Sequence, residues 1–275
     1  MTIRRYFSSD RTPLCADLYE PDPPVLGSPP PQICVVHGYC DHRGRYRDMA
    51  SRLQQAGYRV LVPDLRGHGE AGGARAHVVR FGDYLEDLHA TLTTCAEQGA
   101  MFLLGHSMGG LVVLLYALDR PERVRGLALS SPLFGLKVKV PVWKKALGRI
   151  ASRIHPALAL PNELDPADLS HDPAVGQAYA SDPLVSRIAT ARWFTEMMAA
   201  QAAARRRVRS LRTPLLLMHG GDDRIADPVA SQALFDRVGE RDKVLLIYPG
   251  LYHEIFNERD RDMVIQDLVS WLNAH

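Results

Sequence analysis

The segment Gly105–Gly110, with the sequence GHSMGG, constrains the fold of this 275-residue chain more than any other segment. It joins the apolar run Met101–Leu104 to a second apolar run that begins at Leu111. A short buried strand is therefore expected to turn directly into a helix with Ser107 at the turn, which is the setting of a nucleophile elbow. Glycines suit this tight turn, and the free N–H groups of a helix N-terminus favour developing negative charge. Ser107 is thus the candidate nucleophile.

Short apolar runs alternate with helical patterns along much of the chain. Apolar runs without polar alternation fit strands that are covered on both faces, so we predict an α/β fold with a mostly parallel, doubly wound sheet. A hairpin-like pair is expected first, at Ile3–Phe7 and Leu14–Tyr19. The expected core strands are Ile33–His37, Arg59–Val62, Met101–Leu104, Gly126–Leu129, Leu215–Met218 and Val244–Tyr248. The expected helices are Tyr46–Ala56, Tyr84–Glu97, Leu111–Leu118, Pro228–Val238 and Met263–Leu272.

The interval from Ser131 to Arg212 interrupts this alternation, because it contains helical patterns and proline-punctuated loops but no convincing core strand. It lies between two expected core strands. We interpret it as a helical cap over the carboxyl edge of the sheet, where such folds bind ligands. The chain then divides into a first core part at residues 1–130, a cap at 131–212 and a second core part at 213–275.

Composition narrows the class of protein. The net charge of +2 gives no general attraction to nucleic acid. We expect neither a signal peptide nor a membrane span, and hence a cytoplasmic enzyme. Peripheral contact with a membrane is a further option. The four cysteines form no C-x-x-C pair, so buried free thiols are expected and a zinc site is not. They are Cys15, Cys34, Cys40 and Cys95.

A serine nucleophile needs a histidine base and an acid that orients the base, in the chain order serine, acid, histidine. The acid is expected after the strand Leu215–Met218, where Asp222, Asp223 and Asp227 occur. Asp227 precedes a proline and a helical pattern, so it reads as an N-cap. Sequence reasoning alone barely separates Asp222 from Asp223.

The base is expected to be His253, which follows the strand Val244–Tyr248 and comes last in the required order. The tetrahedral intermediate needs at least two donors at its oxyanion. One is the backbone N–H of Met108, directly after the nucleophile. The other is expected from the loop after Ile33–His37, where we select the N–H of Tyr39. No metal or organic cofactor is required by this chemistry.

Several motifs together resemble the monoglyceride lipase and lysophospholipase group of α/β-hydrolases, over nearly the whole chain. They are His37-Gly38, Asp41-His42-x-Gly44-Arg45-Tyr46, Asp64-Leu65-Arg66-Gly67-His68-Gly69, the elbow at 105–110, Ser181-Asp182-Pro183-Leu184, Asp223-Arg224 and Gly250-x-Tyr252-His253. The resemblance implies an α/β-hydrolase fold with an inserted cap. It favours Asp223 over Asp222 as the acid and supports Tyr39 as an oxyanion donor. Asp64 and Arg66 are interpreted as structural braces.

The resemblance also implies a polar pocket floor that holds the glycerol group of a monoacylglycerol. The matching positions here are Asp41, Arg45 and Tyr179, with His106 beside the nucleophile. Two positions depart from the family pattern. Asp41 stands where a glutamate is common, and Tyr39 is bulkier than the small residue often found there.

One cap segment is basic and amphipathic. Trp143, Ala146, Leu147, Ile150, Ala151 and Ile154 recur at helical spacing and predict one apolar stripe. The basic residues are expected on the other face; they are Lys137, Lys139, Lys144, Lys145, Arg149 and Arg153. Two interpretations follow. The apolar stripe either docks on the rest of the cap, or it meets a lipid surface with anionic headgroups.

These observations and the resemblance together predict a serine carboxylester hydrolase that cleaves monoacylglycerols. The alternatives are a lysophospholipase or broad carboxylesterase and, from another class, a lipid-binding protein without turnover. The expected partners are a small lipid ester and, transiently, a membrane surface contacted through the cap. Nucleic acid is not expected.

Overall fold

The computed structural model describes residues 1–21, 29–97, 99–137, 141–162 and 164–275. Its centre is an eight-stranded sheet in the order β1-β2-β4-β3-β5-β6-β9-β10. The pairs β1–β2 and β2–β4 are antiparallel and all later neighbours are parallel, so the predicted hairpin and mostly parallel sheet are confirmed. The strands are β1 Thr2–Phe7, β2 Pro13–Tyr19, β3 Gln32–Val36, β4 Arg59–Asp64, β5 Met101–His106, β6 Val124–Ser130, β9 Leu215–Gly220 and β10 Lys243–Tyr248.

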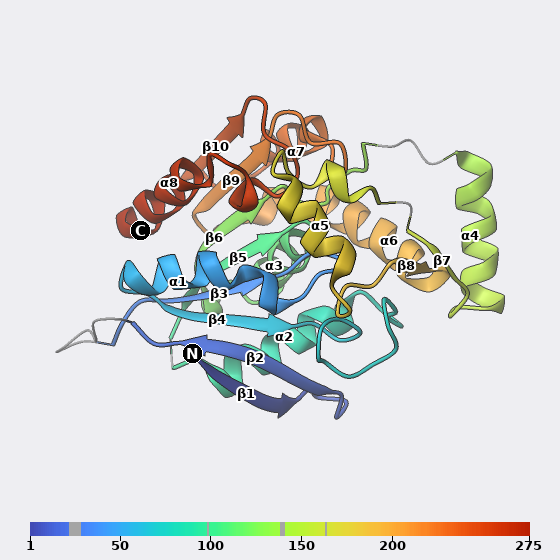
Figure 1. Ribbon diagram of the computed structural model, residues 1–275, viewed down its shortest axis with the longest axis horizontal. Helices are drawn as coiled ribbons and strands as arrows, with labels where there is room; N and C mark the ends of the chain where they lie inside the picture. Colours follow the sequence, from blue (N-terminus) through green and yellow to red (C-terminus); the bar gives the residue numbers. More distant parts are fainter. Residues whose placement is uncertain (22–28, 98, 138–140, 163) are drawn as a thin grey trace.

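Helices cover both faces of the sheet (Figure 1). Successive strand residues enter opposite cores: in β3, Ile33 and Val35 pack on one side and Cys34 and Val36 on the other. This period of two explains why the strands read as continuous apolar runs. The side of Ile33 is covered by α1 (Arg47–Gln55) and α8 (Arg261–Ala274). The opposite side is covered by α2 (Gly82–Cys95), α3 (Met108–Asp119) and α7 (Pro228–Phe235).

The segment between β6 and β9 contributes no strand to the large sheet. It forms α4 (Val142–Ile154), α5 (Pro173–Ser181), α6 (Ala191–Arg207) and a separate antiparallel pair, β7 (Ala159–Pro161) with β8 (Ile188–Thr190). Figure 1 shows these elements gathered on one side of the molecule, with α4 outermost. We refer to residues 131–212 as the cap; these boundaries stay a prediction. Single-turn 3₁₀ helices are η1 Arg43–Tyr46, η2 Pro121–Arg123, η3 Pro166–Asp168, η4 Val208–Ser210 and η5 Ile255–Asn257.

The strand order places the loops after β3 and β5 beside each other at the carboxyl edge of the sheet. Strand β3 pairs with β4 on one side and with β5 on the other, so the chain reverses its direction across the sheet at this point. Open α/β sheets bind ligands at such a switch point, outside the carboxyl ends of the strands. The loops after β3 and β5 therefore flank the expected site.

A buried ion cluster holds the β3 and β4 loops together. Arg43 donates to Asp17 (Nε to Oδ1, 2.9 Å), to Glu70 (Nη2 to Oε2, 2.8 Å) and to Asp64. Asp64 is 1% exposed and also accepts from the backbone N–H groups of Arg43 (2.7 Å) and Glu70 (2.8 Å). These contacts agree with a bracing role for Asp64, because the buried charge is fully hydrogen-bonded.

Replacing Asp64 by alanine should lower the free energy of unfolding by about 3–5 kcal/mol, because it leaves the Arg43 guanidinium buried without its main counter-charge. Urea denaturation followed by circular dichroism measures this. The matched control is Asp48→Ala, which breaks the exposed Asp48–Arg52 pair and should cost less than about 1 kcal/mol. Equal losses in the two variants would contradict a bracing role.

Candidate active site

Ser107 lies at a strained turn between β5 and α3, with φ 54° and ψ −117°. The turn is held by its own backbone: the Ser107 N–H donates to the Ser130 carbonyl (2.9 Å), and the Ser107 carbonyl accepts from the N–H groups of Gly110 and Leu133 (both 3.0 Å). A Cβ on Gly105 would overlap the Gly109 carbonyl, and one on Gly109 would overlap the Val36 carbonyl. The glycines are therefore required by close backbone approach, and the positive φ is the kind of strain that clusters at functional sites.

Asp223 and His253 form a buried pair. His253 Nδ1 lies 2.7 Å from Asp223 Oδ2, and His219 Nε2 lies 3.0 Å from the same oxygen. The other oxygen, Oδ1, accepts from the N–H groups of Ile225 (2.8 Å) and Ala226 (2.9 Å). The neighbouring candidate Asp222 is exposed. Of the two candidates Asp222 and Asp223, it is Asp223 that contacts a histidine after a core strand in the described residues.

Asp227, the third acidic residue of this loop, is the N-cap of α7, and its side chain accepts from the Val229 N–H at 3.1 Å. The N-cap prediction is confirmed.

The surroundings shift the pKa values of this pair in opposite directions. Burial would raise the pKa of Asp223, but the charge of His253 and the hydrogen bonds from the two histidines outweigh it and hold the pKa below its usual range. Burial would lower the pKa of His253, but the Asp223 carboxylate outweighs it, so the pKa is raised above the usual value of a histidine side chain. The pair therefore favours an ionised acid beside a basic histidine.

His37 orients the loop after β3. Its Nδ1 lies 2.7 Å from the Gly38 carbonyl oxygen, while its Nε2 accepts from the Leu65 N–H at 3.0 Å. The Nδ1 is therefore the protonated nitrogen and donates to Gly38. Because the peptide is planar and trans, the N–H of Tyr39 points away from this carbonyl. Neither this N–H nor that of Met108, the first residue of α3, has a protein acceptor in the described part of the chain.

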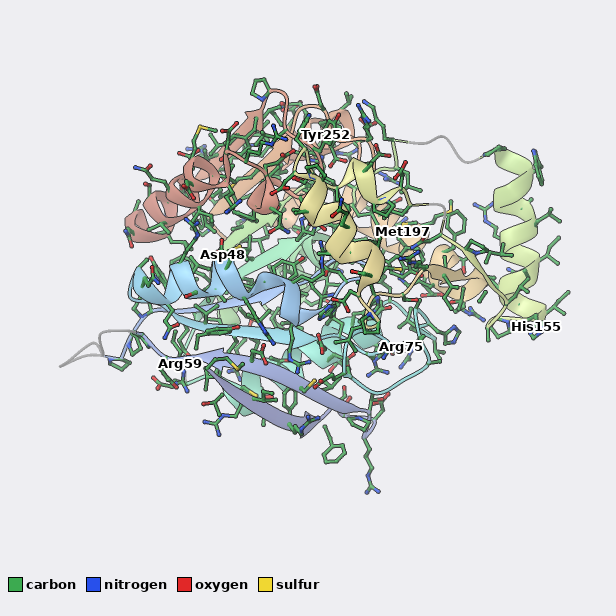
Figure 2. All side chains as sticks on the ribbon, in the orientation of Figure 1. Asp48, Arg59, Arg75, His155, Met197 and Tyr252 are labelled. Atoms are coloured by element: carbon green, nitrogen blue, oxygen red, sulfur yellow. The ribbon has the colours of Figure 1, made fainter. Side chains whose placement is uncertain are left out.

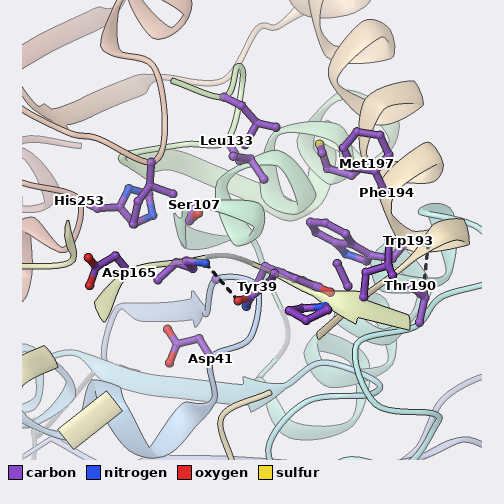
Figure 3. A pocket seen from close by; sticks show the side chains of 18 of the residues that line it. Tyr39, Asp41, Ser107, Leu133, Asp165, Thr190, Trp193, Phe194, Met197 and His253 are labelled. Carbon is purple, nitrogen blue, oxygen red and sulfur yellow. Dashed lines mark hydrogen bonds between the residues drawn. The ribbon is translucent and has the colours of Figure 1, made fainter. Parts of the chain in front are cut away.

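A cavity of about 690 Å³ opens between the sheet and the cap (Figure 3). Ser107, His253 and Tyr39 line it, as do Asp41, Arg45, His106 and Tyr179. Asp223 and Met108 are not among the lining residues. Most of the wall is apolar and comes from the cap: Trp143, Leu147, Ala151, Leu158, Leu160, Leu164, Leu169, Trp193, Phe194 and Met197. The shape and lining fit a long apolar ligand with a polar end.

The polar end of the cavity is an ion network around Arg45. This guanidinium donates to Glu254 through both terminal nitrogens (2.7 and 2.8 Å) and to Asp41 at 3.0 Å. Asp41 also accepts from the Tyr46 hydroxyl at 2.8 Å. Burial would raise the pKa of Asp41, but the charge of Arg45 outweighs it and lowers the pKa. Two carboxylates thus share one cation.

Two further polar side chains face this network. The Arg45 guanidinium lies over the Tyr179 ring, 4.9 Å from its centroid, and the buried Tyr179 hydroxyl has no hydrogen-bond partner in the described residues. Burial, followed by the charge of His253, lowers the pKa of His106 to about 3, so this imidazole is neutral at physiological pH. A hydroxyl group of a ligand could therefore be met by neutral donors and acceptors here.

Three residues at the site were not identified from the sequence: Glu254, His219 and the cap residue Trp193. Glu254 directly follows His253, and His219 lies four residues before Asp223 at the end of β9. Both could have been found from the sequence, because each lies within four residues of a predicted catalytic residue. Trp193 carries no such signal, because it contacts Tyr39 and Met108, which belong to core loops far away along the chain.

Much of the apolar stripe of α4 is exposed to solvent. Trp143, Leu147, Ile150 and Ile154 are 56–79% exposed. The helix packs on α6 through its other side, where the Ser152 hydroxyl bonds the Thr195 hydroxyl at 2.8 Å. Figure 2 shows side chains of α4 extending into open space, with His155 just beyond the helix end. Lys139 and the side chains of Lys144 and Lys145 lie outside the described residues.

All four cysteines are free and buried, as expected. No cluster of three or more metal-ligating side chains occurs in the described residues. Within the same ranges, every helix is too short or too polar to cross a lipid bilayer.

Comparison with known proteins identifies the family. Residues 27–260 match the family described as serine aminopeptidase, S33. The chain is 34% identical over 268 residues to a monoacylglycerol lipase of Mycolicibacterium smegmatis, covering 94% of this chain and 92% of the relative. It is 34% identical over 241 residues to phospholipase YtpA of Bacillus subtilis, covering 85% and 92%.

A solved structure agrees with these relatives. The crystal structure of a Paleococcus ferrophilus monoacylglycerol lipase superposes with a TM-score of 0.86 and 31% identity, covering 95% of this chain and 99% of that chain. The resemblance seen in the sequence motifs is confirmed. The chain has the α/β-hydrolase fold and belongs to the serine aminopeptidase S33 family of serine hydrolases.

Proposed function

We propose that this serine hydrolase cleaves monoacylglycerols to glycerol and a free fatty acid through an acyl-enzyme on Ser107. The observation that carries the proposal is the cavity itself, in which Ser107 and His253 lie between an apolar cap and a polar, ion-paired floor. A monoacylglycerol has the same division, with a long acyl chain on a small neutral alcohol. The names of the relatives from Mycolicibacterium smegmatis and Paleococcus ferrophilus support this substrate.

In the proposed reaction, Asp223 holds His253 through Nδ1, so that Nε2 is left to take the Ser107 proton. The serine oxygen attacks the ester carbonyl, and the N–H groups of Tyr39 and Met108 donate to the resulting oxyanion. The intermediate collapses and glycerol leaves with the proton from His253. Water, activated by the same histidine, then attacks the acyl-enzyme and releases the fatty acid.

The ion network favours a neutral headgroup. Both terminal nitrogens of Arg45 are engaged by Asp41 and Glu254, so the guanidinium has carboxylate partners already. Two carboxylates and one cation give the floor a net charge of about −1, which repels a phosphate. The Tyr179 hydroxyl and neutral His106 suit glycerol hydroxyls instead. For this reason we propose a monoacylglycerol rather than a lysophospholipid as the substrate. The lysophospholipid alternative is the one that the name of the Bacillus subtilis phospholipase supports.

Release of fatty acid from medium- and long-chain monoacylglycerols, beside lysophosphatidylcholine and lysophosphatidic acid, tests this proposal. We expect turnover of monoacylglycerols that falls by at least about 10³ in Ser107→Ala, since removing a triad member leaves only binding and the oxyanion donors. Preference for a lysophospholipid would move the function to that alternative. A folded protein that neither turns over an ester nor reacts with a fluorophosphonate would favour the lipid-binding alternative.

The pH dependence follows from the raised pKa of His253. The base must be neutral to accept the serine proton, so kcat/KM should fall at low pH, with a midpoint above the usual pKa of a histidine side chain. Asp223→Asn removes the charge that raises this pKa. It should move the acidic limb to lower pH and reduce kcat by about 10³–10⁴. The control Asp222→Asn, at the exposed neighbour, should change neither the pH profile nor kcat. If the acidic limb of the profile does not move in Asp223→Asn, Asp223 is not the residue that orients His253.

We further propose that α4 brings the enzyme to a lipid surface. Its exposed stripe includes Ile150 and Ile154, which do not line the cavity, beside Leu147, which does. The exposed Arg149 and Arg153 flank this stripe and suit anionic headgroups. A substrate held in a membrane would then reach the cavity along apolar side chains.

The double variant Ile150→Ser/Ile154→Ser should bind anionic phospholipid vesicles about tenfold more weakly, because two aliphatic side chains no longer enter the lipid. Vesicle sedimentation measures the bound fraction. Val229→Ser, which alters an exposed aliphatic residue on α7, is the matched control and should bind normally. Unchanged binding of the double variant at all salt concentrations would remove α4 as the docking element.

A further inference from the structure

The two proposed oxyanion donors belong to separate loops, yet their side chains meet at one cap residue. Tyr39 follows β3 and Met108 follows β5. Trp193, near the start of α6, contacts the side chains of both. It is buried and also lines the cavity, so it lies between the acyl-binding wall and the two donors.

The contact with Tyr39 is a stacked ring pair. The two ring centroids are 3.5 Å apart with an interplanar angle of 20° (Figure 3). The Tyr39 hydroxyl donates to the Ile188 carbonyl of β8 at 2.7 Å, which is also a cap atom. The side chain whose backbone N–H is the proposed donor is therefore attached to the cap at both its ring face and its hydroxyl. A small residue at position 39 could make neither contact.

The contact with Met108 is a hydrogen bond. The Trp193 indole Nε1–H donates to Met108 Sδ at 3.4 Å, in a buried setting. Met108 is the first residue of α3, so its side chain extends from the same residue whose N–H is the second proposed donor. One indole thus touches both halves of the oxyanion site.

Trp193 is itself fixed to the core. Its backbone N–H donates to the hydroxyl of Thr190, the N-cap of α6, at 3.2 Å. The Thr190 hydroxyl lies 3.3 Å from the Ala76 carbonyl and 3.1 Å from His77 Nδ1. The start of α6 therefore has a defined position relative to the sheet, and a change in that position would be transmitted to Tyr39 and Met108.

We propose that Trp193 is a positioning residue that couples the cap to the oxyanion hole. Both backbone donors are then aligned when the start of α6 packs against the loops after β3 and β5. The inference rests on the proposed function for the identity of the two donors. Oxyanion donors act within a narrow distance range of about 2.7–3.1 Å, so a small shift of either loop weakens stabilisation of the transition state. An acyl chain that fills the cavity and packs against Trp193 would hold the indole in the same position.

Steady-state kinetics of the full chain with p-nitrophenyl acetate test this, because the acetyl group does not need the apolar wall. Trp193→Leu should lower kcat about tenfold with KM changed less than threefold, a partial loss compared with the 10²–10³ typical of removing a donor. The inhibition constant of an alkyl trifluoromethyl ketone, which forms a tetrahedral adduct with serine, should rise by a similar factor. Trp193→Phe keeps a stacking ring but lacks the N–H donor, so kcat should fall only about threefold.

Trp271→Leu removes a buried indole on α8, on the opposite face of the sheet, and is the matched control. It should lower the melting temperature while leaving kcat and the inhibition constant unchanged. Should Trp193→Leu fail to fold, Trp193→Phe decides alone, with an expected loss of about threefold in kcat and in ketone affinity through the lost N–H.

Two results would overturn the proposal. One is unchanged kcat and ketone affinity in folded Trp193 variants, and the other is an effect confined to KM for monoacylglycerols, which would make Trp193 a wall residue only. Wild-type enzyme that cleaves the acetate but no monoacylglycerol would contradict the proposed substrate and leave the Trp193 comparison valid. The two failures are therefore distinguishable.

Discussion

The close packing of backbone at the β5–α3 turn is the constraint on which the rest of the site depends. Gly105 and Gly109 let β5, α3 and the end of β3 approach so closely that no side-chain atom fits between them. The cost is a strained Ser107 backbone, which the surrounding hydrogen bonds to Ser130, Gly110 and Leu133 maintain. Because the turn cannot relax, the serine stands at a fixed point beside the loop after β3, and every other group is arranged around it.

The second organising feature is a carboxylate that is buried away from solvent. Asp223 is 1% exposed, yet it receives two backbone and two imidazole donors. A buried charge is tolerated only when it is satisfied in this way. The arrangement lowers the pKa of Asp223 and raises that of His253, so one set of contacts explains both the stability of the charge and the basicity of the histidine.

The cap and the core contribute different properties to the cavity. The core supplies Ser107, His253 and the Arg45 network, whose positions follow from strand ends and the rigid sheet. The cap supplies most of the apolar wall, an exposed stripe on α4 and, through Trp193, contact with both loops of the proposed oxyanion hole. The cap can therefore set selectivity for the acyl chain while the chemistry of the core stays the same.

Local patterns in the sequence determined a large part of this protein. Strand and helix positions, the elbow, the Asp227 N-cap and the candidates Ser107 and His253 all follow from periodicity, glycine placement and order along the chain, which act over short distances. The remaining features needed the tertiary structure. The Arg45–Glu254 pair joins residues 209 positions apart, and the Trp193–Met108 contact joins residues 85 apart. The exposure of the α4 stripe also needed the tertiary structure, because it depends on which side of α4 packs against α6. Sequence pattern reports which face of an element is apolar, whereas only the packed chain decides what lies against that face.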